Sequence, residues 1–333
     1  MIQLSVGFRL AIYAALGLEL DLDLDDADAE DIDSFQASYD KAFDYAFDRQ
    51  FRKLEEAEEA NMWASIRWMR EVLGKLKEKA KDLELRDGRE EDYFCLIQQR
   101  DTYNEEEVSM LLDIMILASY HTSAVTVAWT LYLLSLNPQV QRRLAEEVRA
   151  CPPLRPSARY RLSGGNHEKG GEELSIAKVE QLPYLHAVIA ESLRVVTPGT
   201  FAARELREDI SLCQGVRLRK GQAVLFPLQD IHLDPRNYLR PTEFDPTRFL
   251  GKEEDGEALK RRKPSSCYVP FGFGARACPG ERFAWAESKV LLFAIMQHFN
   301  VSSAPPSFPP IVSQQRFVQI AKDGIHLTLK PHS

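Results

Sequence analysis

One long apolar segment, Asn104–Leu136, constrains the fold of this chain more than any other feature. It contains neither proline nor glycine, it is stopped by the following "NP", and Asn104 with Glu107 forms the Asn-x-x-Glu pattern of a helix start. At about 1.5 Å per residue, such a helix would be ~48 Å long. Asp113, His121 and several Ser and Thr residues interrupt the segment in ways that lipid penalises. We therefore expect this helix to run through the middle of a large soluble domain.

The composition is sufficient to bury such a helix, because 44% of the 333 residues are hydrophobic. The formal net charge of −8 argues against a nucleic-acid partner, and much of it lies in the acidic run Glu19–Asp33, which is expected to be a solvated loop.

The apolar "LAIYAALGL" near the N-terminus is too short to span a bilayer, so no membrane segment is expected. The cysteines are scattered without a CxxC pair, which favours a reducing compartment over a disulfide framework or a zinc module: Cys95, Cys151, Cys213, Cys267 and Cys278.

Helical periodicity governs most of the remaining chain, with β-prone runs confined to short stretches. The region 206–228 alternates around an "RKGQ" turn and predicts a small hairpin sheet, and the tail "FVQIAKDGIHLTLKP" is expected to form a closing hairpin. We expect a single domain, residues 1–333, that is mainly α with small β-sheets. The helices expected besides the long one lie within residues 1–103 and at 139–148, 179–196 and 281–299.

A glycine-rich stretch at Pro270–Glu287, "PFGFGARACPGERFAWAE", contains a single cysteine and allows three interpretations. The dinucleotide pattern Gly-x-Gly-x-x-Ala is formally met, but no repeated βαβ pattern surrounds it and Gln297 stands where an acid is needed. Cys278 could instead be a small buried hydrophobe. The third interpretation places Pro279 at the first helical position, so that free N–H groups and the helix dipole favour a Cys278 thiolate. With Arg276 nearby, such a thiolate suits a metal ligand, a nucleophile or a redox sulfur.

The same stretch resembles the haem-binding signature of the cytochrome P450 family. The pattern Phe-x-x-Gly-x-Arg-x-Cys-x-Gly is matched by Phe271, Gly274, Arg276, Cys278 and Gly280. The resemblance implies that Cys278 is the axial ligand of haem iron and that Arg276 pairs with a haem propionate. A thiolate ligand donates electron density to iron and favours O–O cleavage, which explains the need for sulfur at this position.

Further elements that resemble the family occur in the expected order. Glu191 and Arg194 in "ESLR" resemble its Glu-x-x-Arg pair, whose spacing puts both side chains on one helix face. Arg248 in "FDPTRF" resembles the arginine that completes a buried Glu-Arg-Arg network with a structural role. Arg204 is expected to be a second propionate-binding arginine. Taken alone, Glu191 and Arg194 would read as an ordinary surface pair.

The long helix departs from the family pattern at "ASYHTS", residues 118–123. Ala118 and Thr122 match the family's Ala-Gly-x-acid-Thr motif, whereas Ser119 replaces the glycine and His121 replaces the acid. The resemblance assigns proton relay to Thr122 together with His121, whose ordinary pKa lies near neutrality. The alternatives are a core histidine satisfied by a backbone carbonyl, impaired oxygen activation, or rearrangement of a peroxide that is already bound.

The resemblance is firm from about Asn104 to Lys330 and weak over residues 1–103, which implies a cytochrome P450-like fold that is N-terminally truncated. Its implied cofactor is haem b. The implied reaction is insertion of one oxygen atom of O2 into an apolar small-molecule substrate, with electrons from NADPH through a reductase of the NADPH-dependent or ferredoxin type. Residues near Ile114–Leu117, with Val196 and Phe201, are expected to face that substrate.

Two other functions remain open at this point: a haem-thiolate isomerase or dehydratase of lipid peroxides, and a non-catalytic, truncated haem-binding paralogue. By analogy with eukaryotic relatives, a full-length form is expected at the cytoplasmic face of the endoplasmic reticulum.

Overall fold

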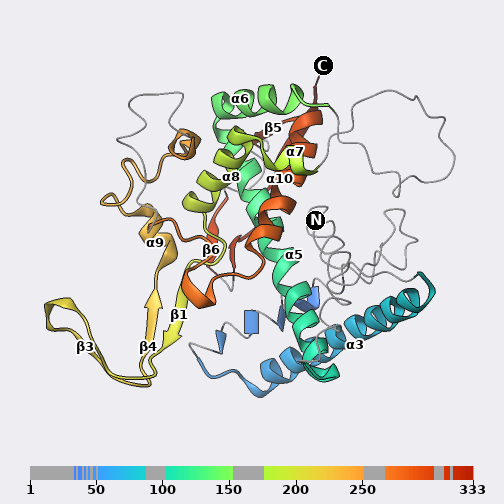
Figure 1. Ribbon diagram of the computed structural model, residues 1–333, viewed down its shortest axis with the longest axis vertical. Coiled ribbons are helices and arrows are strands. Elements are labelled where there is room, and N and C mark those ends of the chain that lie inside the picture. Colours follow the sequence, from blue (N-terminus) through green and yellow to red (C-terminus); the bar gives the residue numbers. More distant parts are fainter. Residues whose placement is uncertain are drawn as a thin grey trace. The chain divides into compact units, whose positions relative to one another are not determined.

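The computed structural model describes residues 52–87, 103–152, 176–250, 267–303, 311–315 and 318–332, with scattered residues between Ser34 and Arg49. The chain divides into two compact units, Met1–Val125 and Thr126–Ser333 (Figure 1). Helix α5 (Glu105–Leu136) belongs to both units, so this division does not decide the prediction of a single domain. The acidic run, the N-terminal apolar stretch and Cys95 lie outside the described residues.

Helix α5 begins with the predicted capping box. The Asn104 N–H donates to Glu107 Oε2 at 2.9 Å, and the Glu107 N–H donates to Asn104 Oδ1 at 2.9 Å. The second half of the helix is almost continuously buried from Ser123 to Leu134, as expected, whereas Ile114 in the first half is 59% exposed. Among the described residues, α5 is long and apolar enough to cross a membrane by length and composition alone, a test that a soluble core helix also passes.

In the first unit, helix α3 (Glu56–Asp87) supplies the partner for the acid that interrupts α5. Lys77, which is buried, forms an ion pair with Asp113, and its Nζ donates to Ser109 Oγ at 2.8 Å. A buried charge is tolerated when it is paired and hydrogen-bonded, so Asp113 is a structural residue of this unit. The unit's buried apolar residues include Leu54, Met62, Met69, Leu73, Val108, Leu112 and Ile116.

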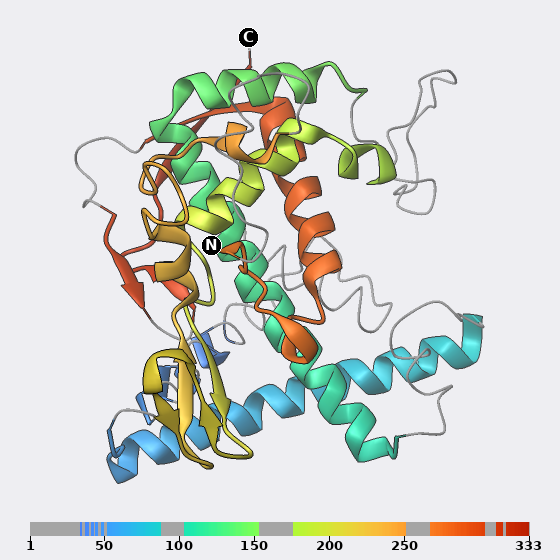
Figure 2. The same ribbon diagram turned by 60° about the vertical axis from the view of Figure 1, so that its left-hand side comes forward.

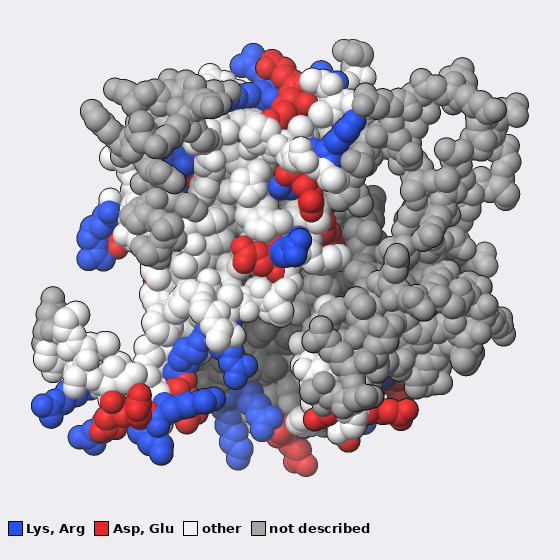
Figure 3. Space-filling view, in the orientation of Figure 1, with Lys and Arg blue, Asp and Glu red and all other residues white. Residues whose placement is uncertain are grey.

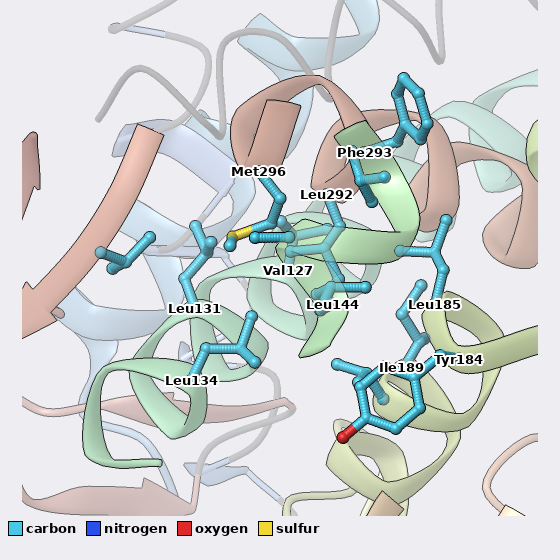
Figure 4. Close-up of a cluster of buried hydrophobic side chains, with 14 of the residues drawn as sticks. Val127, Leu131, Leu134, Leu144, Tyr184, Leu185, Ile189, Leu292, Phe293 and Met296 are labelled. Carbon is cyan, nitrogen blue, oxygen red and sulfur yellow. The ribbon is translucent and has the colours of Figure 1, made fainter. Parts of the chain in front are cut away.

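In the second unit, helices pack around the second half of α5, with α8 and α10 beside it in both views (Figures 1 and 2). Thr130 Oγ1 of α5 donates to Ser192 Oγ of α8 at 2.8 Å. The core cluster draws on α5, α6, α8 and α10, with Leu134, Leu144, Leu185, Leu292 and Phe293 all fully buried (Figure 4). The helices are α6 (Pro138–Arg149), α7 (Ile176–Glu180), α8 (Pro183–Val195), α9 (Leu228–Leu233) and α10 (Glu281–His298).

The predicted helix over 179–196 is wrong in its first part, because α7 ends at Glu180 and α8 begins at Pro183. Proline is favoured in a first turn, where its missing N–H needs no partner. The Glu147 carboxylate of α6 accepts the N–H groups of Tyr184 and Leu185 at 2.9 and 2.8 Å. An acid from a neighbouring helix thus fixes where α8 begins.

The β-structure consists of two-stranded antiparallel sheets in the order β1–β4, β2–β3, β5–β8 and β6–β7. The hairpin sheet predicted at 206–228 is wrong in its pairing, because β3 and β4, which flank the "RKGQ" turn, pair with β2 and β1 and not with each other; Ala202 of β1 lies opposite Phe226 of β4. The predicted closing hairpin is wrong, because the two strands of the tail, β7 and β8, pair with β6 and β5 and not with each other. The strands are β1 (Ala202–Glu205), β2 (Ile210–Ser211), β3 (Arg217–Leu218), β4 (Ala223–Phe226), β5 (Phe299–Ser303), β6 (Ser313–Gln315), β7 (Gln319–Ala321) and β8 (Leu327–Pro331).

Candidate functional site

The glycine-rich stretch forms a tight loop that turns back on itself before Cys278. Gly272 and Gly274 have φ angles of 75° and 68°, in the left-handed region that other L-residues enter at a cost. The Gly272 N–H donates to Val269 O at 3.0 Å, and the Cys278 N–H donates to Phe271 O at 2.8 Å. The glycines therefore permit the fold of the loop, and two backbone hydrogen bonds fix the position of the cysteine.

The predicted place of Pro279 at the first helical position is wrong. Helix α10 begins at Glu281 with Gly280 as its N-cap, so Cys278 lies two residues before the cap. Pro279 and Gly280 form a turn instead, and the Gly280 N–H donates to the Cys278 sulfur. The N–H group that favours a thiolate thus comes from this turn and not from the first turn of the helix.

The Cys278 side chain is exposed, so its interpretation as a small buried hydrophobe is wrong. Partial desolvation of the sulfur raises the pKa of the Cys278 thiol, the Gly280 hydrogen bond opposes this shift, and the Glu281 charge adds to it. One backbone donor therefore does not suffice to make a thiolate near neutral pH. A bound metal cation does, because a coordinating thiol loses its proton.

Behind the loop, Glu191, Arg194 and Arg248 form the buried network that the sequence predicted. Arg194 donates to the Glu191 carboxylate from Nε at 2.7 Å and from Nη2 at 2.8 Å, and Arg248 Nε donates to Glu191 Oε1 at 3.2 Å. Glu191 and Arg194 are 0% exposed, which rules out an ordinary surface pair. Burial raises the pKa of the Glu191 carboxyl, and the hydrogen bonds from Arg194 oppose that shift.

The network reaches the cysteine loop through aromatic residues that sequence reasoning did not single out. Arg194 lies over the Tyr238 ring at 4.9 Å, and the Tyr238 hydroxyl donates to Cys267 O at 3.2 Å. The Tyr268 hydroxyl donates to Ala190 O in α8 at 3.0 Å. These residues lie in proline-punctuated coil, where periodicity gives no signal. Their contacts anchor the segment that leads into the loop.

Both predicted propionate-binding arginines lie at the cysteine loop. Arg276 is exposed in the short 3-10 turn Gly274–Arg276. Arg204 of β1 lies over the ring of Phe273 in the loop, with 5.9 Å from its guanidinium carbon to the ring centre. Figure 3 shows Lys and Arg side chains, with Asp and Glu among them, at the lower left, where Figure 1 places the β1–β4 and β2–β3 strands. Two arginines at the loop that carries an exposed cysteine fit an iron porphyrin with anionic substituents.

The predicted relay residues lie in the first unit, whereas Cys278 lies in the second, so their joint role stays a prediction. Thr122 Oγ1 donates to Ala118 O at 2.9 Å, so this hydroxyl must rotate before it can donate elsewhere. His121 packs against Tyr39 with ring centres 5.4 Å apart, and burial lowers the pKa of His121 to about 4. At neutral pH the imidazole is therefore uncharged and carries one ring proton.

The residues expected to face a substrate are not equivalent. Ile114 is 59% exposed on α5, whereas Ile116 is fully buried in the core of the first unit and is not accessible to a substrate. In the second unit, Val196 is half-buried and Phe201 is exposed. The last two residues remain candidates for substrate contact.

The low pKa of His121 predicts that stability is lost in weak acid. As the pH falls below the ordinary value of 6.5, His121 takes up a proton in the unfolded chain, while in the folded chain it resists protonation until about pH 4. The contribution of neutral His121 to the free energy of unfolding is therefore complete above about pH 6.5. It is lost between pH 6.5 and 4, at about 1.4 kcal/mol per pH unit and about 3 kcal/mol in all. Urea unfolding of the wild type and His121→Gln at several pH values tests this, and equal pH slopes would contradict it.

Exposed Cys278 shares its loop with Arg276, and Arg204 packs on the Phe273 ring of the same loop, as expected of a haem-thiolate protein. The family model "Cytochrome P450" matches residues 31–328, so this chain belongs to the cytochrome P450 family, whose prosthetic group is haem.

Individual relatives agree with this assignment. The chain is 33% identical over 227 residues to "Probable cytochrome P450 6a14" of Drosophila melanogaster, a match that covers 68% of this chain and 41% of that protein. It is 33% identical over 216 residues to "Cytochrome P450 714B1" of Oryza sativa subsp. japonica, which covers 64% of this chain and 36% of that protein. The chain thus spans less than half the length of these relatives.

The fold agrees with solved members of the family. The crystal structure of the cytochrome P450DA heme domain superposes with a TM-score of 0.78 at 21% identity, and it covers 100% of this chain and 67% of that chain. The expected architecture, mainly α with small sheets, is confirmed as a cytochrome P450 fold.

Proposed function

We propose that this chain provides the haem-thiolate site of a monooxygenase that inserts one oxygen atom of O2 into an apolar organic substrate. The observation that carries the proposal is the exposed Cys278 sulfur, held by a glycine turn in front of a fully buried Glu191–Arg194 pair. Haem supplies the activation of O2 when it is bound.

The roles of the residues follow from their chemistry. Cys278 Sγ would bind the iron, and the Gly280 N–H would stabilise negative charge on that sulfur. Arg276 and Arg204 would pair with the propionates. Thr122 with His121 would relay protons, and His121, neutral at pH 7, would do so by accepting a proton on one nitrogen while donating from the other.

The substrate is proposed to be an apolar small molecule that contacts Val196 and Phe201, and the electrons to come from NADPH through a reductase. One relative, 29% identical over 237 residues, is "Taurochenodeoxycholic 6 alpha-hydroxylase" of Sus scrofa. That name supports hydroxylation as the reaction class over rearrangement of lipid peroxides. We further propose a reducing compartment, at the cytoplasmic face of the endoplasmic reticulum for a full-length form. Free cysteines in the described part of the chain, such as Cys151 and Cys213, are compatible with this location.

Oxygen uptake tests the proposed function. The purified chain, loaded with haem and mixed with an NADPH-dependent reductase and a panel of apolar compounds, is expected to consume O2 in an NADPH-dependent way and to form hydroxylated product. The Cys278→Ser variant provides the control. Loss of a lipid hydroperoxide without NADPH would instead indicate an isomerase, and bound haem without either reaction would indicate a non-catalytic haem-binding protein.

A further inference from the structure

His232 is a buried histidine that the roles described so far leave unused. It lies in α9, is 0% exposed, and its ring lies 5.6 Å from the ring of Tyr268. Its backbone carbonyl accepts a hydrogen bond from Arg194 Nη1 at 2.9 Å. The backbone of His232 is thus hydrogen-bonded to the buried network, and its imidazole makes separate contacts.

The two imidazole nitrogens of His232 contact different segments of the second unit. Nε2 lies 2.9 Å from the Val269 N–H, which can only donate, so Nε2 is the acceptor and carries no proton. The proton is then on Nδ1, which lies 2.8 Å from Thr197 Oγ1, and that hydroxyl donates onward to Leu193 O at 2.8 Å. The hydrogen bonds all run in one direction and fix a neutral Nδ1–H tautomer.

The contact with Val269 leads directly to the cysteine. Val269 O accepts the N–H of Gly272, which opens the turn, and Phe271 O accepts the N–H of Cys278, which closes it. From His232 to Cys278 there are therefore three hydrogen bonds in sequence, connected by short stretches of backbone. Tyr238, in contrast, holds the carbonyl of Cys267, which lies further from the turn.

We propose that His232 is a positioning residue that sets the cysteine loop through the Val269 N–H, and so determines where the Cys278 sulfur lies. The part of this inference that concerns an iron ligand rests on the proposed function. The part that concerns the position of the loop does not, because the hydrogen bonds belong to the protein chain itself.

Two substitutions distinguish the contact made by Nε2 from the contact made by Nδ1. In His232→Gln, the side-chain oxygen reaches the place of Nε2 and can still accept from Val269. In His232→Asn, the shorter side chain reaches only the place of Nδ1, so the Val269 N–H is left without its acceptor. Tyr238→Phe removes only the hydrogen bond to Cys267 and is the matched control.

The experiment measures amide hydrogen exchange at Val269 and the rate of Cys278 alkylation in the full chain without added haem. His232→Asn is expected to lower protection of the Val269 amide at least about fivefold and to speed alkylation, because a partly buried donor loses its acceptor. His232→Gln and Tyr238→Phe are expected to keep both values within about twofold of wild type. Equal protection in the Asn and Gln variants, or an effect of Tyr238→Phe as large as that of Asn, would overturn the proposal.

The wild-type chain gives a test that does not depend on any variant folding. Nitrogen chemical shifts of the His232 ring should show a proton on Nδ1 and none on Nε2, and the opposite tautomer or a charged ring would refute the inference. In haem-loaded chains, the red-shifted Soret band of the reduced, CO-bound form should persist in the Gln variant and weaken in the Asn variant. If wild type lacks that band while the exchange results hold, the proposed function fails and the positioning role stands.

Discussion

Replacing Glu191 by alanine is expected to destabilise the second unit by about 3–5 kcal/mol, because it leaves two buried guanidinium groups without their anion. Arg194 and Arg248 both donate to this carboxylate, which also accepts the Asp245 N–H at 2.9 Å. No water replaces these contacts cheaply at a site that is 0% exposed. A loss of this size is a large part of the roughly 5–15 kcal/mol by which typical domains are stable, so the unfolded fraction of the variant is expected to rise clearly at 37 °C.

Urea unfolding of wild type and Glu191→Ala measures the change in the free energy of unfolding. The matched control is Glu243→Ala, whose carboxylate pairs with Arg240 at 2.7 Å while both side chains are about half exposed. That surface pair is expected to contribute no more than about 1 kcal/mol. If Glu191→Ala costs no more than the control, the buried network does not support the cysteine loop as described.

The sequence was sufficient to predict the elements whose signals are local. The capping box at Asn104 and Glu107 and the proline after α5 mark the ends of the long helix correctly. The Glu-x-x-Arg spacing of Glu191 and Arg194 was likewise enough to place both groups on one face of α8. Each of these features depends on residues within a turn or two of each other, which is why pattern reasoning finds them.

Features that depend on distant partners could not be predicted in this way. The start of α8 depends on Glu147 from another helix, and the strands of the C-terminal tail depend on partners upstream. His232 lies in a coil-rich region, and only its contact with Val269 reveals its place beside the cysteine loop. Asp113 in the long helix argued against a lipid environment, but the sequence did not show that its partner is Lys77, which lies on a different helix.

The predicted proton-relay residue His121 shows that the sequence does not determine the pKa of a buried side chain. A histidine in place of an acid suggested a group that titrates near neutral pH, but burial against residues such as Tyr39 lowers the pKa of His121 to about 4. Ordinary pKa values describe exposed side chains, and burial disfavours the charged form. The sequence names the residue and the fold determines its charge.

The Cys278 thiolate is proposed to bind haem iron, and the loss of this ligand on substitution of Cys278 is the second large effect expected. Without the sulfur, the loop keeps its glycine turn but offers the iron no anionic ligand. The matched control is Cys213→Ser, because Cys213 is also exposed but lies in the short 3-10 turn Cys213–Gly215, outside the cysteine loop.

The most direct measurement is the absorption spectrum of the reduced, carbon-monoxide-bound protein for wild type, Cys278→Ser and Cys213→Ser. A red-shifted Soret band is expected in wild type and in Cys213→Ser and should be absent from Cys278→Ser. A wild-type chain that binds no haem, or a band that survives in Cys278→Ser, would contradict the assignment of Cys278 as the iron ligand.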